Sequence, residues 1–538
     1  MKRFFQIFSH KYASVICVLF ALLNRTGFAI FASKIGRDEQ LQLTMTHNLL
    51  AGRGFALIKY FSTDLSTPVK DYTLHFPPGF SMAVIPLLKV FNNNQFAACA
   101  AFDVLAGIFF VLIIRSLCKK LQFPLYFTNI ITVVAGVVQH LIFLESASSD
   151  MLSLDFILGG MVISIGVIEN SRKRNYLNIA GYGLVFFMPA FLRYMYIPFA
   201  PFFPALIFLA GIVRKNNRIR STGLWLTLTT VGYLLLLLLW MKAVPSELIL
   251  PTERGFFPSQ LFSLSWPPFF VASFINIDFV AMRMQNFFNV FYGISYYSLL
   301  FCNIFLLPLF LVTTRFFYRV KKFSFFLVAG WATSWLIIIE LAFLTVTNKP
   351  QVSPYGSWNY IDEGRYYAFV NVFLLLFVFM LASLQSVSKN LFIKIFLVVS
   401  LTLISVETLH GIYFNAKLPF RYREMRSILA RGEYAQKYFE SLLKKVKEEN
   451  DGRDIFVVSP DSYYVNYAAT KEIKSIYDPL KLNERAIQPS QKSILLFVVD
   501  KLYKDQYQNY IEKKNPRLLQ VVGDTYFYEE ELVPGKIE

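Results

Sequence analysis

The stretch KYASVICVLFALLNRTGFAIF (11–31) decides the fold, because its 21 residues include only two charges. A run of about 20 apolar residues is long enough to cross a bilayer as one helix. The preceding MKRFF resembles the start of a signal peptide, but the apolar run is too long and no small-x-small cleavage site follows it. We therefore predict a retained first transmembrane helix, which the acidic pair Asp38-Glu39 follows closely.

The composition supports a membrane protein. Hydrophobic residues make up 55% of the 538 positions, charged residues only 16%, and the mean hydropathy is +0.46. Soluble domains average roughly 25% charged residues, so this composition excludes a disordered chain and a soluble globule. A net charge of +18 would ordinarily suggest nucleic acid, but here it predicts basic loops sorted to one side of a membrane and no nucleic-acid partner. The four cysteines form no CxxC pair or Cys/His cluster that would indicate a metal or disulfide framework.

Ten further apolar runs resemble the first, so we predict a mainly α, polytopic protein with about 11 transmembrane helices. The predicted spans are 12–33, 95–117, 124–144, 151–168, 176–193, 197–213, 222–241, 294–314, 323–345, 366–386 and 391–412. A further run, Gly79–Phe91, has 13 residues and contains Pro86, so it is too short to cross comfortably. We expect it to form a juxtamembrane or half-inserted helix on the outer side.

The distribution of Lys and Arg predicts the orientation, because short cytoplasmic loops carry an excess of both. If the N-terminus is cytoplasmic and Gly79–Phe91 does not cross, all the basic loop clusters fall inside. These clusters are Arg115/Lys119/Lys120, Arg172/Lys173/Arg174, Arg214/Lys215/Arg218/Arg220, Arg315/Arg319/Lys321/Lys322 and Lys389/Lys394. The loops 34–94, 145–150, 242–293 and 346–365 then lie outside, together with the tail.

The chain divides into two predicted domains. Residues 1–412 form the transmembrane domain, and residues 413–538 are much richer in charge. Within this tail, the strand-like runs Asp454–Ser459 and Ser493–Asp500 alternate with helix-like segments, which is typical of a small soluble α/β domain.

Ionisable residues are costly at membrane depth, so those gathered at the outer helix ends are candidates for function. Asp38 and Glu39 open the segment GRDEQLQLTMTHNLLAGRGF, whose apolar positions suggest an amphipathic helix lying on the membrane. Asp38 would lie near the N-cap of this helix, where it could serve as a simple cap or as a functional carboxylate. His75 precedes Pro77-Pro78-Gly79 and could bond a phosphate or sugar, although the prolines alone are ordinary helix-start residues.

A short polar turn, Glu145-Ser-Ala-Ser-Ser-Asp150, joins two predicted spans. Its carboxylates and hydroxyls suit sugar hydroxyls or a general base, but the turn could also be a polar connection with an Asp cap. Asp155 lies further into the same span, where it could extend the site or bond another helix. Asp103 also lies within a span and is left unassigned.

Two Arg-Tyr pairs lie at outer helix ends, Arg193-Tyr194 and Arg365-Tyr366. Arginine at an interface can snorkel to lipid headgroups, or its guanidinium can bind a lipid-linked phosphate. No P-loop, dinucleotide motif or HExxH is present. A divalent metal could still bind Asp38, Glu39 or Asp150, but their spacing does not require one, and no cofactor is assigned.

Together these motifs resemble the GT-C class of membrane glycosyltransferases, and most closely its branch of protein O-mannosyltransferases and aminoarabinose–lipid A transferases. The resemblance rests on motifs that occur in order over residues 1–412: Asp38-Glu39, Pro77-Pro78-Gly79-Phe80, Ser146 to Asp150, Leu192-Arg193-Tyr194 and Arg365-Tyr366. One departure is the loop at His75, where the aminoarabinose transferase has a Lys beside the proline, so His75, Lys70 and Arg193 are the alternative candidates for a phosphate contact.

The resemblance implies a polyprenyl-phosphate-linked sugar donor and transfer on the outer face to a glycan, lipid or protein acceptor. It implies Asp38 as the catalytic base or acceptor-orienting group, Glu39 and Asp150 beside it, and Arg365 as a contact to the donor phosphate. Glu145, Tyr194 and Tyr366 would line the same cavity. The expected location is a bacterial inner membrane, with the N-terminus cytoplasmic and the C-terminal domain periplasmic.

Three other classes of protein share parts of this pattern. A transporter or flippase would usually show inverted repeats and broken midplane helices rather than long outer loops. A polysaccharide polymerase or ligase has a similar number of spans but does not need the acidic pair after the first one. A non-enzymatic scaffold could use the tail to hold a partner.

Overall fold

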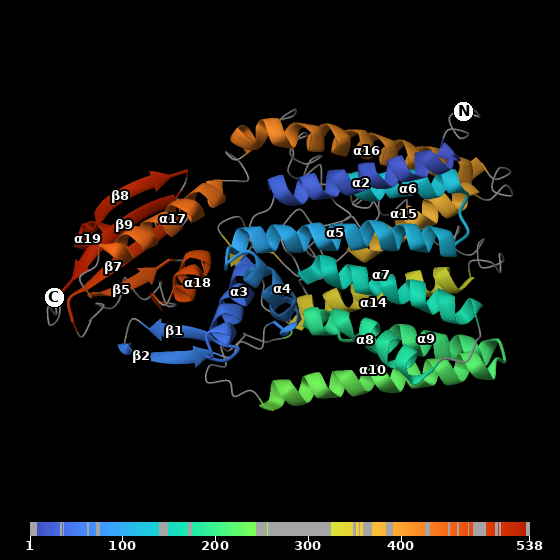
Figure 1. Ribbon diagram of the computed structural model, residues 1–538, viewed down its shortest axis with the longest axis horizontal. Helices are drawn as coiled ribbons and strands as arrows, with labels where there is room; N and C mark the ends of the chain where they lie inside the picture. The colour runs from blue at the N-terminus through green and yellow to red at the C-terminus, as the bar shows by residue number, and fades with distance from the viewer. Residues whose placement is uncertain are drawn as a thin grey trace.

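The computed structural model shows a long helical bundle with a β-sheet domain at one end (Figure 1). It describes residues 8–32, 35, 37–61, 64–71, 76–138, 149–170, 175–243, 256, 324–347, 351–353, 356–358, 368–383, 391–425, 431–449, 452–459, 462–471, 473–476, 491–500, 504, 507–523 and 525–533. We call the end that carries the sheet the domain end and the opposite end the far end.

The bundle is built from apolar helices. Its helices are α2 (Lys11–Ala32), α5 (Gln95–Lys120), α6 (Leu125–Val137), α7 (Ser149–Glu169), α8 (Tyr176–Leu192), α9 (Phe199–Val213), α10 (Asn217–Ala243), α14 (Ser324–Thr347), α15 (Ala368–Ser383) and α16 (Leu391–Met425). A short 3₁₀ helix, η2 (Tyr194–Tyr196), connects α8 to α9. Ten of the eleven predicted spans therefore coincide with helices, and the eleventh, 294–314, lies outside the described residues.

The chain is an integral membrane protein. Within the described residues, seven helices are long and apolar enough to cross a membrane, and α4, α6, α8 and α15 are shorter apolar helices. Large apolar side chains are exposed along the outer helices, for example Leu19 on α2, Leu236 on α10 and Val398 on α16. Apolar surface of this kind is expected where helices face lipid.

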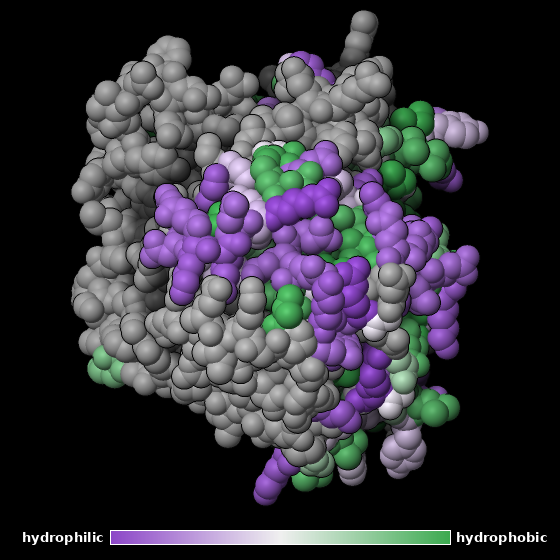
Figure 2. All heavy atoms as spheres, turned by 90° about the vertical axis from the view of Figure 1, so that its left-hand side faces the viewer, coloured by the Kyte–Doolittle hydropathy of each residue, from purple (hydrophilic) through white to green (hydrophobic). Residues whose placement is uncertain are grey.

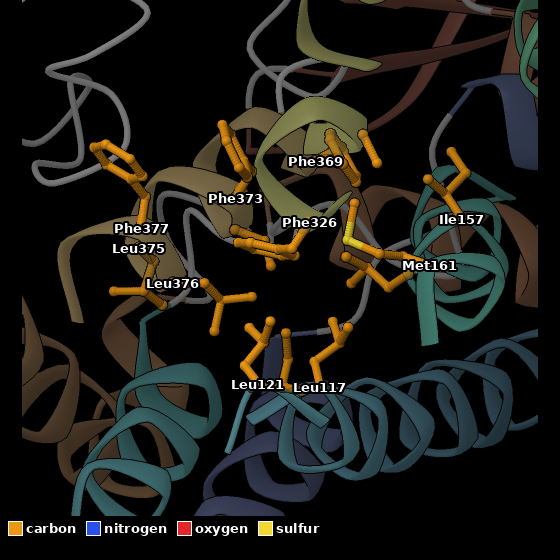
Figure 3. Packing of buried hydrophobic residues seen from close by; sticks show 14 of the residues in the cluster. Leu117, Leu121, Ile157, Met161, Phe326, Phe369, Phe373, Leu375, Leu376 and Phe377 are labelled. Atoms are coloured by element: carbon orange, nitrogen blue, oxygen red, sulfur yellow. The ribbon is translucent and has the colours of Figure 1, made fainter. Parts of the chain in front are cut away.

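The centre of the bundle is a close-packed apolar core (Figure 3). Helix α15 contributes Phe369, Phe373 and Phe377, which pack with Phe326 of α14 and Met161 of α7. Every residue of α15 from Ala368 to Leu381 is buried, and apart from Asn371 all of these residues are apolar. A helix that is hydrophobic all round belongs in an interior, so α15 lies inside the bundle.

Two helices connect the bundle to the sheet domain: α3 (Arg37–Leu50) and α4 (Gly79–Val90). At about 1.5 Å per residue, the 12 residues of α4 span only about 18 Å, which agrees with the short helix predicted there. Helix α3 differs from the expected amphipathic helix, because its burial is not confined to one apolar face. Its polar residues Gln40, Gln42 and Thr44 are as buried as Leu43, since α3 packs against α4 on one side and α18 on the other.

The soluble part contains a seven-stranded sheet in the order β2-β1-β6-β5-β7-β9-β8. Its strands are β1 (Leu57–Phe61), β2 (Asp64–Asp71), β5 (Asp454–Val458), β6 (Lys474–Ile476), β7 (Ser493–Asp500), β8 (Arg517–Val522) and β9 (Thr525–Leu532). The neighbours β1, β6, β5 and β7 are parallel, and the other pairings are antiparallel. The strands predicted near 454 and 493 are β5 and β7, whereas β1, β2, β6, β8 and β9 were not anticipated.

Helices α17 (Arg431–Glu448), α18 (Ser462–Thr470) and α19 (Gln508–Lys514) accompany this sheet, and a separate hairpin pairs β3 (Gln351–Ser353) with β4 (Gly356–Trp358). The first two strands of the main sheet come from the loop 34–94, because β1 pairs with β6 at Tyr60 and Ile476. The sheet is thus assembled from both ends of the chain. Seen from the domain end, the described residues are mainly hydrophilic, as expected for a surface in water (Figure 2).

Candidate functional site

A buried ion pair joins α7 to the end of α8 at the domain end. Arg193 Nη2 lies 2.7 Å from Asp150 Oδ2, and Arg193 Nε donates a hydrogen bond of 3.0 Å to Ser149 Oγ. Arg193 is only 7% exposed and Asp150 only 4%. Two residues predicted from separate motifs therefore meet in one place, 43 positions apart in the chain.

The helix ends explain why this pair forms here. Asp150 is in the first turn of α7, and Arg193 follows the last residue of α8 in an extended conformation, with φ −149° and ψ 128°. A carboxylate is favoured at a helix N-terminus and a cation at a helix C-terminus. The antiparallel packing of α7 and α8 brings these two termini together, so the pair also has a structural function.

Tyr194 continues the same site as the first residue of η2. Its hydroxyl oxygen is buried and has no hydrogen-bond partner among the described residues. A buried phenol usually has a partner, so this oxygen is suited to bond a ligand.

Two close contacts bring α3 toward this site through α4. Ser81 Oγ donates a 3.1 Å hydrogen bond to the carbonyl oxygen of Gln42 on α3. Gly79 lies against the end of α8, since a Cβ at this position would be only 2.3 Å from the carbonyl oxygen of Phe191. The Pro-Pro-Gly motif therefore has a packing function: it lets α4 start next to the residues that position Arg193.

The acidic pair after the first span lies on α3. Asp38 is the second residue of this helix. Glu39 is only 3% exposed. Glu39 lies within electrostatic range of the Cys99 thiol on α5, and so does Asp103, which the sequence alone left unassigned. Glu39 and Asp103 thus both act on the same buried part of α5.

Asp155 does not belong to the Asp150–Arg193 pair. It is 3% exposed and interacts with the charge of Arg25 on α2. Arg25 donates hydrogen bonds to the carbonyl oxygens of Ala135, at 3.1 and 2.7 Å, and Val138, at 2.9 Å. Because the last carbonyls of a helix lack partners within it, Arg25 satisfies the end of α6. Asp155 thus interacts electrostatically with a charge on another helix, although neither of its carboxylate oxygens has a hydrogen-bond partner among the described residues.

Arg25 was missed by the sequence reasoning, although a charge in the middle of an apolar run is a signal that could have found it.

Four predicted site residues, His75, Glu145, Arg365 and Tyr366, lie outside the described residues. Among the residues that the structure describes, no group of three His, Cys, Asp or Glu side chains could hold a metal ion.

Comparison with known proteins identifies the fold. No protein-family model matches the chain, and no curated protein matches it. The structure is similar to that of ArnT from Cupriavidus metallidurans bound to undecaprenyl phosphate, with a TM-score of 0.52, 11% sequence identity, and coverage of 96% of this chain and 97% of ArnT. The archaeal oligosaccharyltransferase AglB from Archaeoglobus fulgidus, in complex with an inhibitory peptide and a dolichol-phosphate, gives a TM-score of 0.43 at 11% identity, covering 93% of this chain and 71% of AglB.

The similarity to ArnT extends over almost the whole length of both chains. At 11% identity this similarity shows the fold alone, so the predicted polytopic, mainly helical fold is confirmed and is ArnT-like.

Proposed function

We propose that the protein is a glycosyltransferase that moves a sugar from a polyprenyl-phosphate carrier to an acceptor on the outer, periplasmic side of a bacterial inner membrane. The observation that carries this proposal is the buried Arg193–Asp150–Ser149 cluster, located at the end of an ArnT-like bundle where α3 carries Asp38 and Glu39. ArnT itself was crystallised with undecaprenyl phosphate, which supports a lipid phosphate as the carrier.

The proposed reaction needs a base and a group that stabilises the leaving phosphate. An acceptor hydroxyl attacks the anomeric carbon and forms the new glycosidic bond while the bond from that carbon to the phosphate oxygen breaks. The hydroxyl proton passes to a carboxylate, for which we propose Asp38, with Glu39 and Asp150 beside it. The electron pair of the broken bond stays on the polyprenyl phosphate.

Arginine is suited to the charge that builds on this leaving group. A guanidinium in a site with little water stabilises developing phosphate charge strongly. We propose Arg193 and Arg365 for this function, with His75 as a further phosphate contact. Glu145, Tyr194 and Tyr366 would line the cavity for the sugar or acceptor. A divalent metal is not required by this scheme.

The test is release of polyprenyl phosphate from a labelled lipid-linked sugar in membranes that contain the protein. We expect Asp38→Asn and Arg193→Gln to lower release by at least about 100-fold, the usual effect of removing an acid–base or charge-stabilising group. Glu448→Gln and Arg218→Gln change the same chemical groups at exposed positions of α17 and the far end, and should leave release unchanged.

Two results would contradict the proposal. Undiminished release by a well-folded Asp38→Asn variant would remove the assigned function of Asp38. Movement of the intact lipid-linked sugar across the bilayer, without release of polyprenyl phosphate, would instead identify a flippase.

A deletion strain that lacks one cell-envelope glycan or glycolipid would identify the acceptor and sugar.

A further inference from the structure

A pocket lies at the far end of the bundle, away from the Arg193–Asp150 pair. It is enclosed by the last residues of α5, α7 and α9 and the first residues of α14, and its volume is about 60 Å³. Helix α7 has 21 residues, so its two ends are about 31 Å apart at 1.5 Å per residue. The right-hand ends of α5 and α7 in Figure 1 mark this region.

The rim of the pocket is polar and carries a net positive charge. Lys120 and Arg214 provide two cations and Glu169 one anion, with Gln122 as a neutral hydrogen-bonding group. Lys120 Nζ lies 3.7 Å from a Glu169 carboxylate oxygen, with both side chains partly exposed, at 33% and 43%. An ion pair this exposed is weak, so Lys120 can turn to another anion at little cost.

The floor of the pocket is apolar. Leu121, Ile165, Ile168 and Phe326 line it, and all four are less than 9% exposed. A site with a cationic rim over an apolar floor suits an amphipathic anion better than a hydrated inorganic one.

The direction of the helices supports an anion at the rim. Cations at the ends of α5 and α9 are partly explained by the negative ends of these helices. Helix α14, however, begins here, and its second and third residues, Phe325 and Phe326, line the pocket. The first amides of a helix have no acceptor within it and favour negative charge. The negative ends of α5 and α9 explain why cations lie there. They do not explain why a cavity lies between these cations and the start of α14.

We propose that this pocket binds the phosphate of an anionic phospholipid. Lys120, Arg214 and the first amides of α14 would contact the phosphate, and the glycerol and first acyl carbons would lie on Ile168 and Phe326. A volume of about 60 Å³ exceeds the space that one water needs, which is about 10–15 Å³, and is sufficient for a small polar group. Basic pockets between transmembrane helices are a known means of recognising lipid headgroups.

The experiment measures lipid binding to the purified full-length protein by native mass spectrometry. Phosphatidylglycerol is titrated against the unsubstituted protein, the pocket variant Lys120→Gln/Arg214→Gln, and the control Lys119→Gln/Arg218→Gln. The control removes the same two charges from exposed positions close in sequence to Lys120 and Arg214 that do not line the pocket. Phosphatidylcholine and excess inorganic phosphate are the comparison ligands.

We expect the pocket variant to bind phosphatidylglycerol about 30-fold more weakly, because two cation contacts are lost, while the control stays within about threefold of the unsubstituted protein. Phosphatidylcholine should bind weakly to all three proteins, and excess inorganic phosphate should not displace phosphatidylglycerol. If the double variant fails to fold, Arg214→Gln alone, at an exposed side chain, should weaken binding by about fivefold.

Three outcomes would overturn the proposal. Equal loss in the pocket variant and the control would show a general effect of charge. No loss in the pocket variant would exclude the pocket as the binding site. Complete displacement by inorganic phosphate would show that the site selects a free anion rather than a lipid.

Discussion

At the residue scale, the Arg193–Asp150 pair combines a structural and a proposed chemical function in the same atoms. Charges buried this deeply lose their hydration, and each is tolerated only because the other is 2.7 Å away. The same pairing would hold a carboxylate and a guanidinium ready at the domain end. Substitutions can separate the two functions. Stability requires that no buried charge is left without a partner, whereas the proposed chemistry requires the carboxylate and the guanidinium themselves.

We expect Asp150→Leu and Arg193→Met each to lower the free energy of unfolding by about 3–5 kcal/mol, because each leaves one buried charge without its partner. The double variant should recover most of that loss, since no charge is left buried. Denaturant unfolding in mild detergent measures the stability, and polyprenyl phosphate release should be lost in all three variants. A double variant as unstable as the singles would argue against a direct pair.

The stability of the folded protein should depend on pH through His47 of α3, which lies outside the membrane-spanning helices. Burial, together with the positive charges of Lys471 and Arg53, lowers the pKa of His47 to about 4. Between pH 4 and the ordinary value of 6.5, the unfolded chain therefore binds a proton at this position and the folded chain does not. The stabilisation is present above pH 6.5 and is lost as the pH falls toward 4.

The melting temperature should thus fall as the pH is lowered from 7 to 4.5, and His47→Gln should reduce that slope. His10→Gln, at an exposed histidine, is the matched control and should keep the original slope. An unchanged slope in His47→Gln would show that other groups dominate the acid response.

At the scale of elements, tertiary packing decides the contacts of α3 and α4. The pattern of apolar and polar residues within each helix does not predict these contacts. The alternation of Leu and polar residues in α3 suggested one face on the membrane, yet both faces are covered by α4 and α18. The length of α4 was predictable from its 13-residue run, whereas its position depends on the contact of Gly79 with Phe191. A contact between residues 112 positions apart leaves no mark in local sequence.

We expect Gly79→Ala to destabilise the protein by about 1–3 kcal/mol, because its methyl group would lie 2.3 Å from a backbone oxygen that cannot move aside easily. Release activity should fall as well, since α4 supports the end of α8 that positions Arg193. Gly159→Ala is the control, because nothing lies within 4 Å of a Cβ there and alanine favours a helix. A Gly79→Ala variant as stable as this control would contradict the close contact.

At the scale of the whole molecule, the loop 34–94 and the tail are joined in one sheet. Strand β1 pairs with β6, and a second apolar cluster combines Leu43 of α3, Phe80 of α4 and Phe439 of α17. Residue 412 is the predicted boundary between the two domains. Strands β1 and β2 come before this boundary in the sequence, but they belong to the sheet that the C-terminal domain forms. The tail therefore stabilises the helix that carries Asp38 and Glu39.

The orientation in the membrane gives a prediction for the whole chain. Lys119 and the exposed basic residues after α9 lie at the far end, and the sheet lies at the domain end. If the far end is cytoplasmic, an impermeant thiol reagent added to spheroplasts should label Glu448→Cys and not Lys119→Cys. The unsubstituted protein serves as the blank for the four native cysteines, of which Cys17, Cys99 and Cys118 are buried and Cys302 lies outside the described residues. Labelling of Lys119→Cys alone would reverse the proposed topology.

The sequence by itself determined the membrane class, ten of the described helices and the short helix at Gly79. Hydropathy and charge are properties of each segment alone, so they can be read without knowing its neighbours. Only the tertiary structure decided that Asp150 meets Arg193, that Asp155 lies within electrostatic range of Arg25, and that the loop after the first span completes the sheet of the tail. These are contacts between distant segments, and packing and burial, rather than local pattern, select which polar groups meet.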